Sequence, residues 1–206
     1  MATLAELVAD LQFVMQDFST EVMTSARAKY LINLALKQIS RETGAFKGTD
    51  STVVSVPTTG IDVPDDYLRI DSIKVATATG KNIVYTQQTA EQYDVLEFSD
   101  NSFIYYIDND GKIYFNHTLN AGDIVKVRYS KLHDELVSDS DETYPFLNGY
   151  DEMIVSYAAY KMCNVNGEAQ QAQINFAEYK RLIGEFSLKS NAASSVPVFI
   201  PAYRRY

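Results

Sequence analysis

Tryptophan is absent from this chain of 206 residues, cysteine occurs once and histidine twice. The single cysteine, Cys163, excludes a disulfide within the chain and is typical of a protein that folds in a reducing compartment. No apolar run approaches the ~20 residues that a membrane-spanning helix needs. The first residues lack the basic stretch of a signal peptide, and Glu6 and Asp10 interrupt their apolar face. We therefore expect an intracellular origin and no membrane partner.

Positive charge is also scarce, and the formal net charge is −9. A sequence-wide acidic balance argues against a protein that grips nucleic acid through its phosphates. It is compatible with a protein that DNA slides past, because like charges prevent adhesion. Tyrosine (15 residues) and phenylalanine (10 residues) are plentiful. Because tyrosine joins an apolar ring to a polar tip, this excess favours interfaces as much as cores.

The sequence contains few groups arranged for catalysis or metal binding. His117 and His133 have no partner at a metal-ligand spacing, and both are interpreted as surface residues. Asp108–Gly111 lacks the other ligands of a calcium loop and is interpreted as a hairpin turn. Asp65-Asp66 is interpreted as a turn, and Cys163 as a small apolar helix residue. We therefore predict that the protein is not an enzyme and uses neither a metal nor another cofactor.

Four segments carry the apolar spacing of amphipathic helices, with a repeat every three or four residues. Thr3 and Glu6 stand at the spacing of a capping box, in which each side chain satisfies a free backbone N–H. Gly44 follows the second segment and readily adopts the left-handed conformation found after helix ends. The predicted helices are 3–18, 25–43, 148–163 and 168–188.

The helix at 148–163 carries three tyrosines at successive turns. Its first turn holds acidic residues, which the positive end of the helix dipole stabilises. Three large aromatic side chains at this spacing cannot all face one small core, so at least one is predicted to face a neighbouring subunit. The candidate subunit-interface residues are Tyr150, Tyr157 and Tyr160.

Between the two helix pairs the apolar period changes to the alternation of strands. Six or seven short strands are predicted, beginning with a hairpin over residues 54–63. A bulge is predicted between Ile70 and Ile73, where strict alternation slips, and a short helix capped by Thr89 follows. The strongest hairpin signal is the Asp-Gly turn within residues 102–115.

These elements predict an α+β fold in which the terminal helices need each other to bury their apolar stripes. We expect a four-helix bundle formed by residues 1–46 and 145–190. Residues 47–144 would form an inserted antiparallel β-domain, and residues 191–206 an extended C-terminal arm.

The C-terminal arm begins with a linker composition at residues 191–195 and continues as an apolar, aromatic and basic segment. Its proline content excludes a helix, and its anchors are of the kind found at interface centres. Two arginines are a weak signal for nucleic acid, so we predict a protein-docking segment. The alternative is that it folds back on its own β-domain. The candidate partner-binding residues are Val198, Phe199, Ile200, Tyr203, Arg204, Arg205 and Tyr206.

Five segments, taken in order and spacing, carry a family resemblance: Ala26–Arg41, Ile61–Ile73, Asp110–Phe115, Gly122–Tyr129 and Tyr150–Cys163. In this order they resemble tailed-bacteriophage head-to-tail adaptor proteins, also called connector or neck ring proteins, which are related in architecture to the tail tubular proteins of short-tailed phages. The resemblance covers about residues 20–188.

The resemblance implies a structural virion protein, made in the bacterial host cytoplasm and placed at the neck beneath the portal vertex. Such proteins form homo-oligomeric rings, here expected to be a dodecamer, that join the portal protein to the tail or to another neck ring protein. The helices would line the channel or stack on the portal, and the C-terminal arm would reach into an adjoining ring. DNA would pass through without specific binding.

Two other functions are weighed against this one. Aromatic residues in Phe103–Tyr106 and Tyr114–Phe115 are compatible with a binding module whose β-domain recognises a carbohydrate or a protein, although alternation assigns about half of them to a core. A hydrolase built on Asp65, Asp66 and His117 has no support in their spacing.

Overall fold

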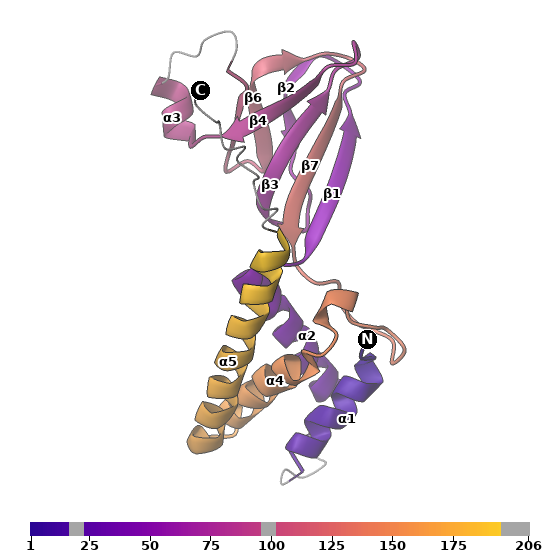
Figure 1. Ribbon diagram of the computed structural model, residues 1–206, viewed down its shortest axis with the longest axis vertical. Helices are drawn as coiled ribbons and strands as arrows, with labels where there is room; N and C mark the ends of the chain where they lie inside the picture. Colours follow the sequence, from indigo (N-terminus) through magenta and orange to yellow (C-terminus); the bar gives the residue numbers. More distant parts are fainter. Residues whose placement is uncertain (17–22, 96–101, 195–206) are drawn as a thin grey trace, which may run out of the picture. The chain divides into compact units, whose positions relative to one another are not determined.

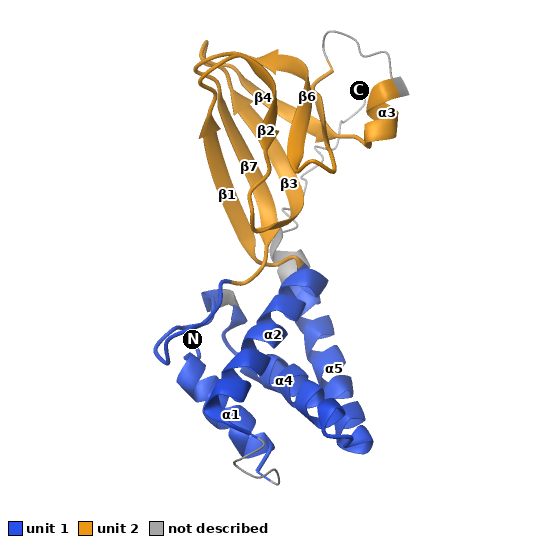
Figure 2. Cartoon of the chain, turned by 180° about the vertical axis from the view of Figure 1, so that it is seen from behind, with its two compact units in different colours: residues 1–43, 134–206 blue, residues 44–133 orange. Residues whose placement is uncertain are grey.

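The computed structural model describes residues 1–16, 23–95 and 102–194. Over these residues the chain is mixed α+β, with five α-helices and one seven-stranded sheet, which confirms the predicted fold class. The chain divides into two compact units, one of residues 1–43 and 134–206 and the other of residues 44–133 (Figure 2). We call them the helical unit and the β unit.

The described part of the helical unit contains four α-helices (Figure 1) and one short 3-10 helix, η1 (Pro145–Leu147). The Thr3 side chain accepts the Glu6 N–H at 3.2 Å and the Glu6 carboxylate accepts the Thr3 N–H at 2.8 Å, so the predicted capping box is confirmed. Gly167 (φ 79°) takes the left-handed conformation in the tight turn between the last two helices. The helices are α1 (Leu4–Val14), α2 (Ser25–Thr43), α4 (Asp151–Val165) and α5 (Ala169–Ser194).

Helix α4 packs against α1, α2 and α5. Ala158 and Ala159 are fully buried at its centre, and their small side chains allow neighbouring helices to come close. The core around them combines residues from both ends of the chain. Its fully buried members include Leu4, Leu7 and Leu11 of α1, Ile32 and Ala35 of α2, and Met153, Ile154 and Met162 of α4.

Residues 134–144 lie with the helical unit, and most of their acidic side chains are exposed, as the composition of residues 133–143 predicts. Asn33 of α2 holds this segment: its Oδ1 accepts the Leu136 N–H and its Nδ2 donates to the Leu136 carbonyl, both at 2.9 Å. The Asp141 carbonyl accepts the Leu4 N–H at 2.8 Å. These bonds tie the segment to α1 and α2, and composition alone does not reveal them.

The β unit is a single sheet with the strand order β1-β7-β3-β4-β5-β6-β2 (Figure 1). Neighbouring strands are antiparallel except β4 and β5, which form a short parallel pair, so the predicted antiparallel insertion is correct apart from this pair. The strands are β1 (Lys47–Val53), β2 (Thr58–Asp62), β3 (Tyr67–Ala76), β4 (Asn82–Gln87), β5 (Ile104–Ile107), β6 (Lys112–Leu119) and β7 (Ile124–Lys131).

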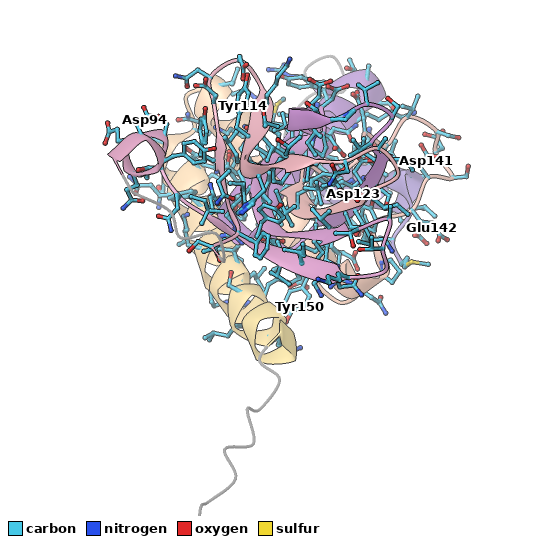
Figure 3. All side chains as sticks on the ribbon, turned by 90° about the horizontal axis from the view of Figure 1, so that it is seen from above. Asp94, Tyr114, Asp123, Asp141, Glu142 and Tyr150 are labelled. Atoms are coloured by element: carbon cyan, nitrogen blue, oxygen red, sulfur yellow. The ribbon has the colours of Figure 1, made fainter. Side chains whose placement is uncertain are left out.

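The sheet curls so that one face encloses an apolar core. The rings of Tyr85 and Phe115 meet edge to face there, with centroids 4.9 Å apart. Asp123 (Figure 3), in the turn before β7, is only 3 % exposed. Its carboxylate accepts the N–H groups of Ala78 and Asn120 at 2.9 and 2.8 Å. A buried carboxylate therefore fixes two turns to each other.

The predicted hairpin over residues 54–63 is wrong. β1 and β2 do not pair; they are the two edge strands, bonded to β7 and β6 respectively. Alternation of apolar and polar residues identifies strands and cannot identify their partners. Val56, which contributes to the alternation, lies in the connection between β1 and β2 and is 66 % exposed.

The other local predictions in the β unit are confirmed. The register of β3 on β7 shifts between Ile70 and Ser72, which is the predicted bulge. The Asp-Gly turn joins β5 to β6, with Gly111 at φ 79°. The Thr89 hydroxyl accepts the Gln92 N–H at 3.2 Å at the start of α3 (Ala90–Val95).

At the C-terminal end, α5 continues through residues 191–194, where composition predicts a linker. That prediction is wrong for these four residues. Ala192 and Ala193 favour the helical state, and the first proline after them is Pro197. Residues 195–206 lie outside the described part of the chain.

Candidate interaction surfaces

The three tyrosines of the sequence prediction lie in or beside α4, and α5 covers two of them. Tyr150 is 9 % exposed and meets the Phe186 ring at 5.1 Å. Tyr157 is 6 % exposed and meets the Tyr179 ring at 4.8 Å. Both contacts stay within the helical unit, so these two side chains serve its core.

Tyr160 is the least buried of the three and packs on Phe176 of α5, with ring centroids 4.7 Å apart. Phe176 is itself 36 % exposed. Lys161 lies over the Tyr160 ring at 5.4 Å, and Lys180 lies over the Phe176 ring at 5.4 Å. An aromatic pair bordered by two lysines therefore forms a surface on the α4–α5 hairpin, which we call the aromatic ridge.

A groove of about 430 Å³ crosses α1, α4 and α5 of the helical unit. Its apolar part is Phe13, 74 % exposed, together with Val14. Its rim is acidic, with Asp10 and Asp151 on opposite helices. Burial, and the nearby carboxylates of Asp10 and Glu6, raise the pKa of the Asp151 carboxyl. The groove therefore suits a partner that is apolar and basic.

The outer face of the β1-β7-β3 part of the sheet holds a hollow of about 210 Å³, which we call the cationic hollow. Lys74 on β3 lies directly opposite Lys126 on β7, and Arg128 follows two residues along β7. Threonine and serine hydroxyls stand between the cations. The lining residues are Thr49, Ser51, Ser72, Lys74, Lys126 and Arg128.

A second hollow, of about 570 Å³, lies where edge strand β1 meets the turn after β2, and we call it the acidic hollow. Four aspartates line it: Asp50, Asp62, Asp65 and Asp66. Lys131 lies 3.7 Å from Asp66. Burial, with a hydrogen bond to Asp66, raises the pKa of Tyr129 to about 12, so this phenol stays protonated at neutral pH.

The residues of the hydrolase alternative are not brought together. Asp62, just before the Asp65-Asp66 turn, pairs with Lys112, and His117 lies five residues further along β6, roughly 17 Å of strand. The surface assignment is wrong for His133, which is 4 % exposed and packs edge to face on Phe46 at 5.0 Å. No trio of His, Cys, Asp or Glu within the described ranges is placed to hold a metal ion.

Cys163 is buried in the helical unit, 4.0 Å from the Met15 sulfur, and accepts a bond from the Asn175 amide at 3.6 Å. Burial raises the pKa of its thiol, which disfavours the reactive thiolate. This environment agrees with the interpretation of Cys163 as a small apolar helix residue.

The predicted partner-binding residues of the arm, Val198 to Tyr206, lie outside the described residues. Sequence reasoning missed both hollows of the β unit. The alternation Lys126-Val-Arg128 places two cations on one face, and only the register with β3 adds Lys74 to them.

The family model described as SU10 adaptor protein matches residues 2–200, which spans both units. No curated protein matches the chain. Of the helices that the structure describes, none combines the length and the apolar character needed to cross a bilayer.

Proposed function

The chain belongs to the SU10 adaptor protein family, a phage head-to-tail adaptor family, and from this premise we propose that it forms an oligomeric ring between the portal and the tail. As a member of this family it has a structural role in the virion. The proposal adds the ring, its position at the neck and its synthesis in the bacterial host cytoplasm. The family match over residues 2–200 is the observation that carries it.

In this proposal the four helices of the helical unit act as one bundle that stacks on the portal or lines the channel. The chain's net charge of −9 supports passage of DNA without adhesion, because phosphate and carboxylate repel each other. The aromatic ridge supplies a surface for a neighbouring copy. Tyr160, the partly buried tyrosine of the three, lies on this surface, with Tyr150 and Tyr157 holding α4 against α5 beneath it.

The test is a measurement of mass and shape. Purified full-length protein is examined by native mass spectrometry and electron microscopy, alone and with the portal protein of the same phage. Closed rings, or a complex with one ring per portal, support the proposal. A chain that stays monomeric and does not bind the portal contradicts it.

The C-terminal arm is proposed to dock on an adjoining ring through Val198, Phe199, Ile200, Tyr203, Arg204, Arg205 and Tyr206. Deletion of residues 196–206 is expected to leave thermal unfolding unchanged and to abolish ring-to-ring docking in a pull-down with the neighbouring ring. A matched control replaces these residues with a Gly/Ser stretch of equal length and should behave like the deletion. If either variant unfolds at a lower temperature, the arm belongs to the core.

A second candidate is recognition of a carbohydrate by the β unit. Tyr106 and Tyr114 stack at 5.3 Å with rings 20° apart, and Tyr93 meets Tyr106 at 4.5 Å. Tyr114 (Figure 3) donates to Asp110 at 2.7 Å, and this bond raises its pKa to about 12. Half-exposed aromatic faces suit sugar rings, whereas Tyr105 and Phe115 of the same strands are core residues. Binding to a glycan array that Tyr114→Ala abolishes would favour this function.

A further inference from the structure

The two hollows of the β unit lie on opposite faces of the same edge strand. Successive side chains of a strand point to opposite faces. On β1, Thr49 and Ser51 therefore line the cationic hollow, whereas Asp50 and Thr52 line the acidic hollow. On β7, Lys126 and Arg128 lie on the first face and Tyr129 on the second. At this edge of the sheet, the β unit therefore carries positive charge on one face and negative charge on the other.

Over the part of the chain that the structure describes, the charges of the cationic hollow are not neutralised. Lys74 and Lys126 are cross-strand neighbours, an arrangement that destabilises a sheet by repulsion. All three cations are exposed, and within the described residues none of them has an ion-pair partner. The hydroxyls of Thr49 and Ser51 beside them add hydrogen-bond donors. An anionic surface placed here would relieve the repulsion.

The acidic hollow carries an excess of negative charge, which is complementary to the positive charge of the cationic hollow. Of its four carboxylates, Asp66 has the cation Lys131 at 3.7 Å. Asp50, Asp62 and Asp65 are exposed and have no ion-pair partner among the described residues. The exposed carboxylates of this hollow are opposite in sign to the three cations of the other hollow, and one of them, Asp62, also has Lys112 opposite it on β6.

We propose that the cationic hollow of one copy docks on the acidic hollow of the next copy. The proposal rests on the proposed ring and names the surfaces that build it. Because the two surfaces differ, a docked pair leaves one free hollow of each kind, and the contact repeats head to tail until the ring closes. A face-to-face dimer would join two surfaces of the same sign.

The first experiment identifies the contacts directly. Full-length chains labelled with ¹⁴N and ¹⁵N are mixed and treated with a carbodiimide, which joins lysine amines to carboxylates without a spacer. Cross-links between chains of different label are expected to join Lys74 or Lys126 to Asp62 or Asp65. The Lys47–Asp71 pair, 2.7 Å apart within one chain, is the internal control for the reagent. Absence of mixed-label links, or their restriction to other lysines, overturns the proposal.

The second experiment exchanges the charges. Variant one carries Lys126→Glu and Arg128→Glu, and variant two carries Asp62→Lys and Asp65→Lys. Each alone is expected to give at least about tenfold fewer mixed-label links, since close charge pairs across interfaces are strongly coupled. An equimolar mixture should restore them, because each variant then offers the surface that the other needs. Recovery in the mixture also shows that both variants are folded.

The control variant changes the same amount of charge elsewhere. Arg41→Glu with Lys81→Glu alters two exposed side chains that line neither hollow, and it should assemble like the parent chain. A loss of links equal to that of variant one would mean that net charge alone governs association. If duplex DNA added to the parent chain displaces the links, the cationic hollow binds phosphates and the proposal fails.

The outcome is separable from that of the proposed function. Rings that form on the portal with both charge variants would retain the adaptor role and overturn these surfaces. Mixed-label links at the hollows with no binding to the portal would retain the surfaces and overturn the adaptor role.

Discussion

The ion pairs of the helical unit contrast with the two hollows of the β unit, although the β unit also has ion pairs of its own, such as Lys47–Asp71 at 2.7 Å. In the helical unit, cations lie against carboxylates of the same unit. The pairs are Lys29–Asp139 at 2.6 Å, Lys180–Glu42 at 2.8 Å, and Arg181 with Glu178 and Glu185 at 2.5 and 2.6 Å. In the β unit, three cations of β3 and β7 line one hollow, and four aspartates of β1, β2 and the turn after β2 line the other.

The difference follows from geometry. On a helix, residues three or four apart are neighbours, so a cation and a carboxylate can pair within one element, as Arg181 does with Glu178 and Glu185. On a strand, residues two apart share a face, and their neighbours come from other strands. Helix geometry therefore pairs these cations within the helical unit, whereas the cationic hollow of the β unit presents charge that a partner can neutralise.

The largest expected effect concerns the apolar core of the β unit, which lies on one face of its sheet. Phe115→Ala removes a 1 % exposed ring from the single core of the β unit, and we expect a loss of about 3–5 kcal/mol in unfolding free energy. Urea unfolding measures it. Tyr114→Ala is the matched control. Tyr114 directly precedes Phe115 on β6, and its half-exposed ring faces away from this core. Equal losses for the two variants would mean that the core lies on neither face.

The helical unit depends in addition on a buried polar contact. Asn33→Ala leaves the Leu136 N–H and carbonyl without their partner, which we expect to cost about 1–3 kcal/mol. Hydrogen exchange should show lost protection at the Leu136 amide before that of α4. Asn164→Ala, at an exposed position of α4, is the control and should be neutral. An unchanged Leu136 protection factor in Asn33→Ala would contradict the assignment.

The contrast between local contacts in helices and non-local contacts in sheets also explains which parts of the fold can be predicted from the sequence. Helix signals are local: the Thr3–Glu6 capping box and the helix end before Gly44 need only a few residues, and both are present. Strand positions are also local, but strand partners are not. β1 pairs with β7, with Lys47 opposite Ser130, and no local pattern connects two segments so far apart in the chain.

The candidate surfaces were predictable to the same extent. Helical spacing predicts that Tyr150, Tyr157 and Tyr160 cannot all face one core, but which of them is least buried depends on Phe186 and Tyr179 of α5. The cationic hollow requires the register of β3 on β7, which includes a bulge that shifts every later residue of β3. Periodicity carries no information on that register until the partner strand is known.

The smallest expected effect compares the removal of one positive charge from each unit, and the two removals should change stability in opposite directions. Lys180→Gln removes a partner of Glu42 and should destabilise the helical unit by about 0.2–1 kcal/mol. Lys74→Gln removes one of two like charges facing each other and should stabilise the β unit by about 0.2–1 kcal/mol. Thermal unfolding at low protein concentration, where copies do not associate, measures both. High salt should shrink both changes, because the charges are exposed to screening. If Lys74→Gln destabilises the chain and the loss persists in high salt, Lys74 acts through the packing of its stem and not through repulsion by Lys126.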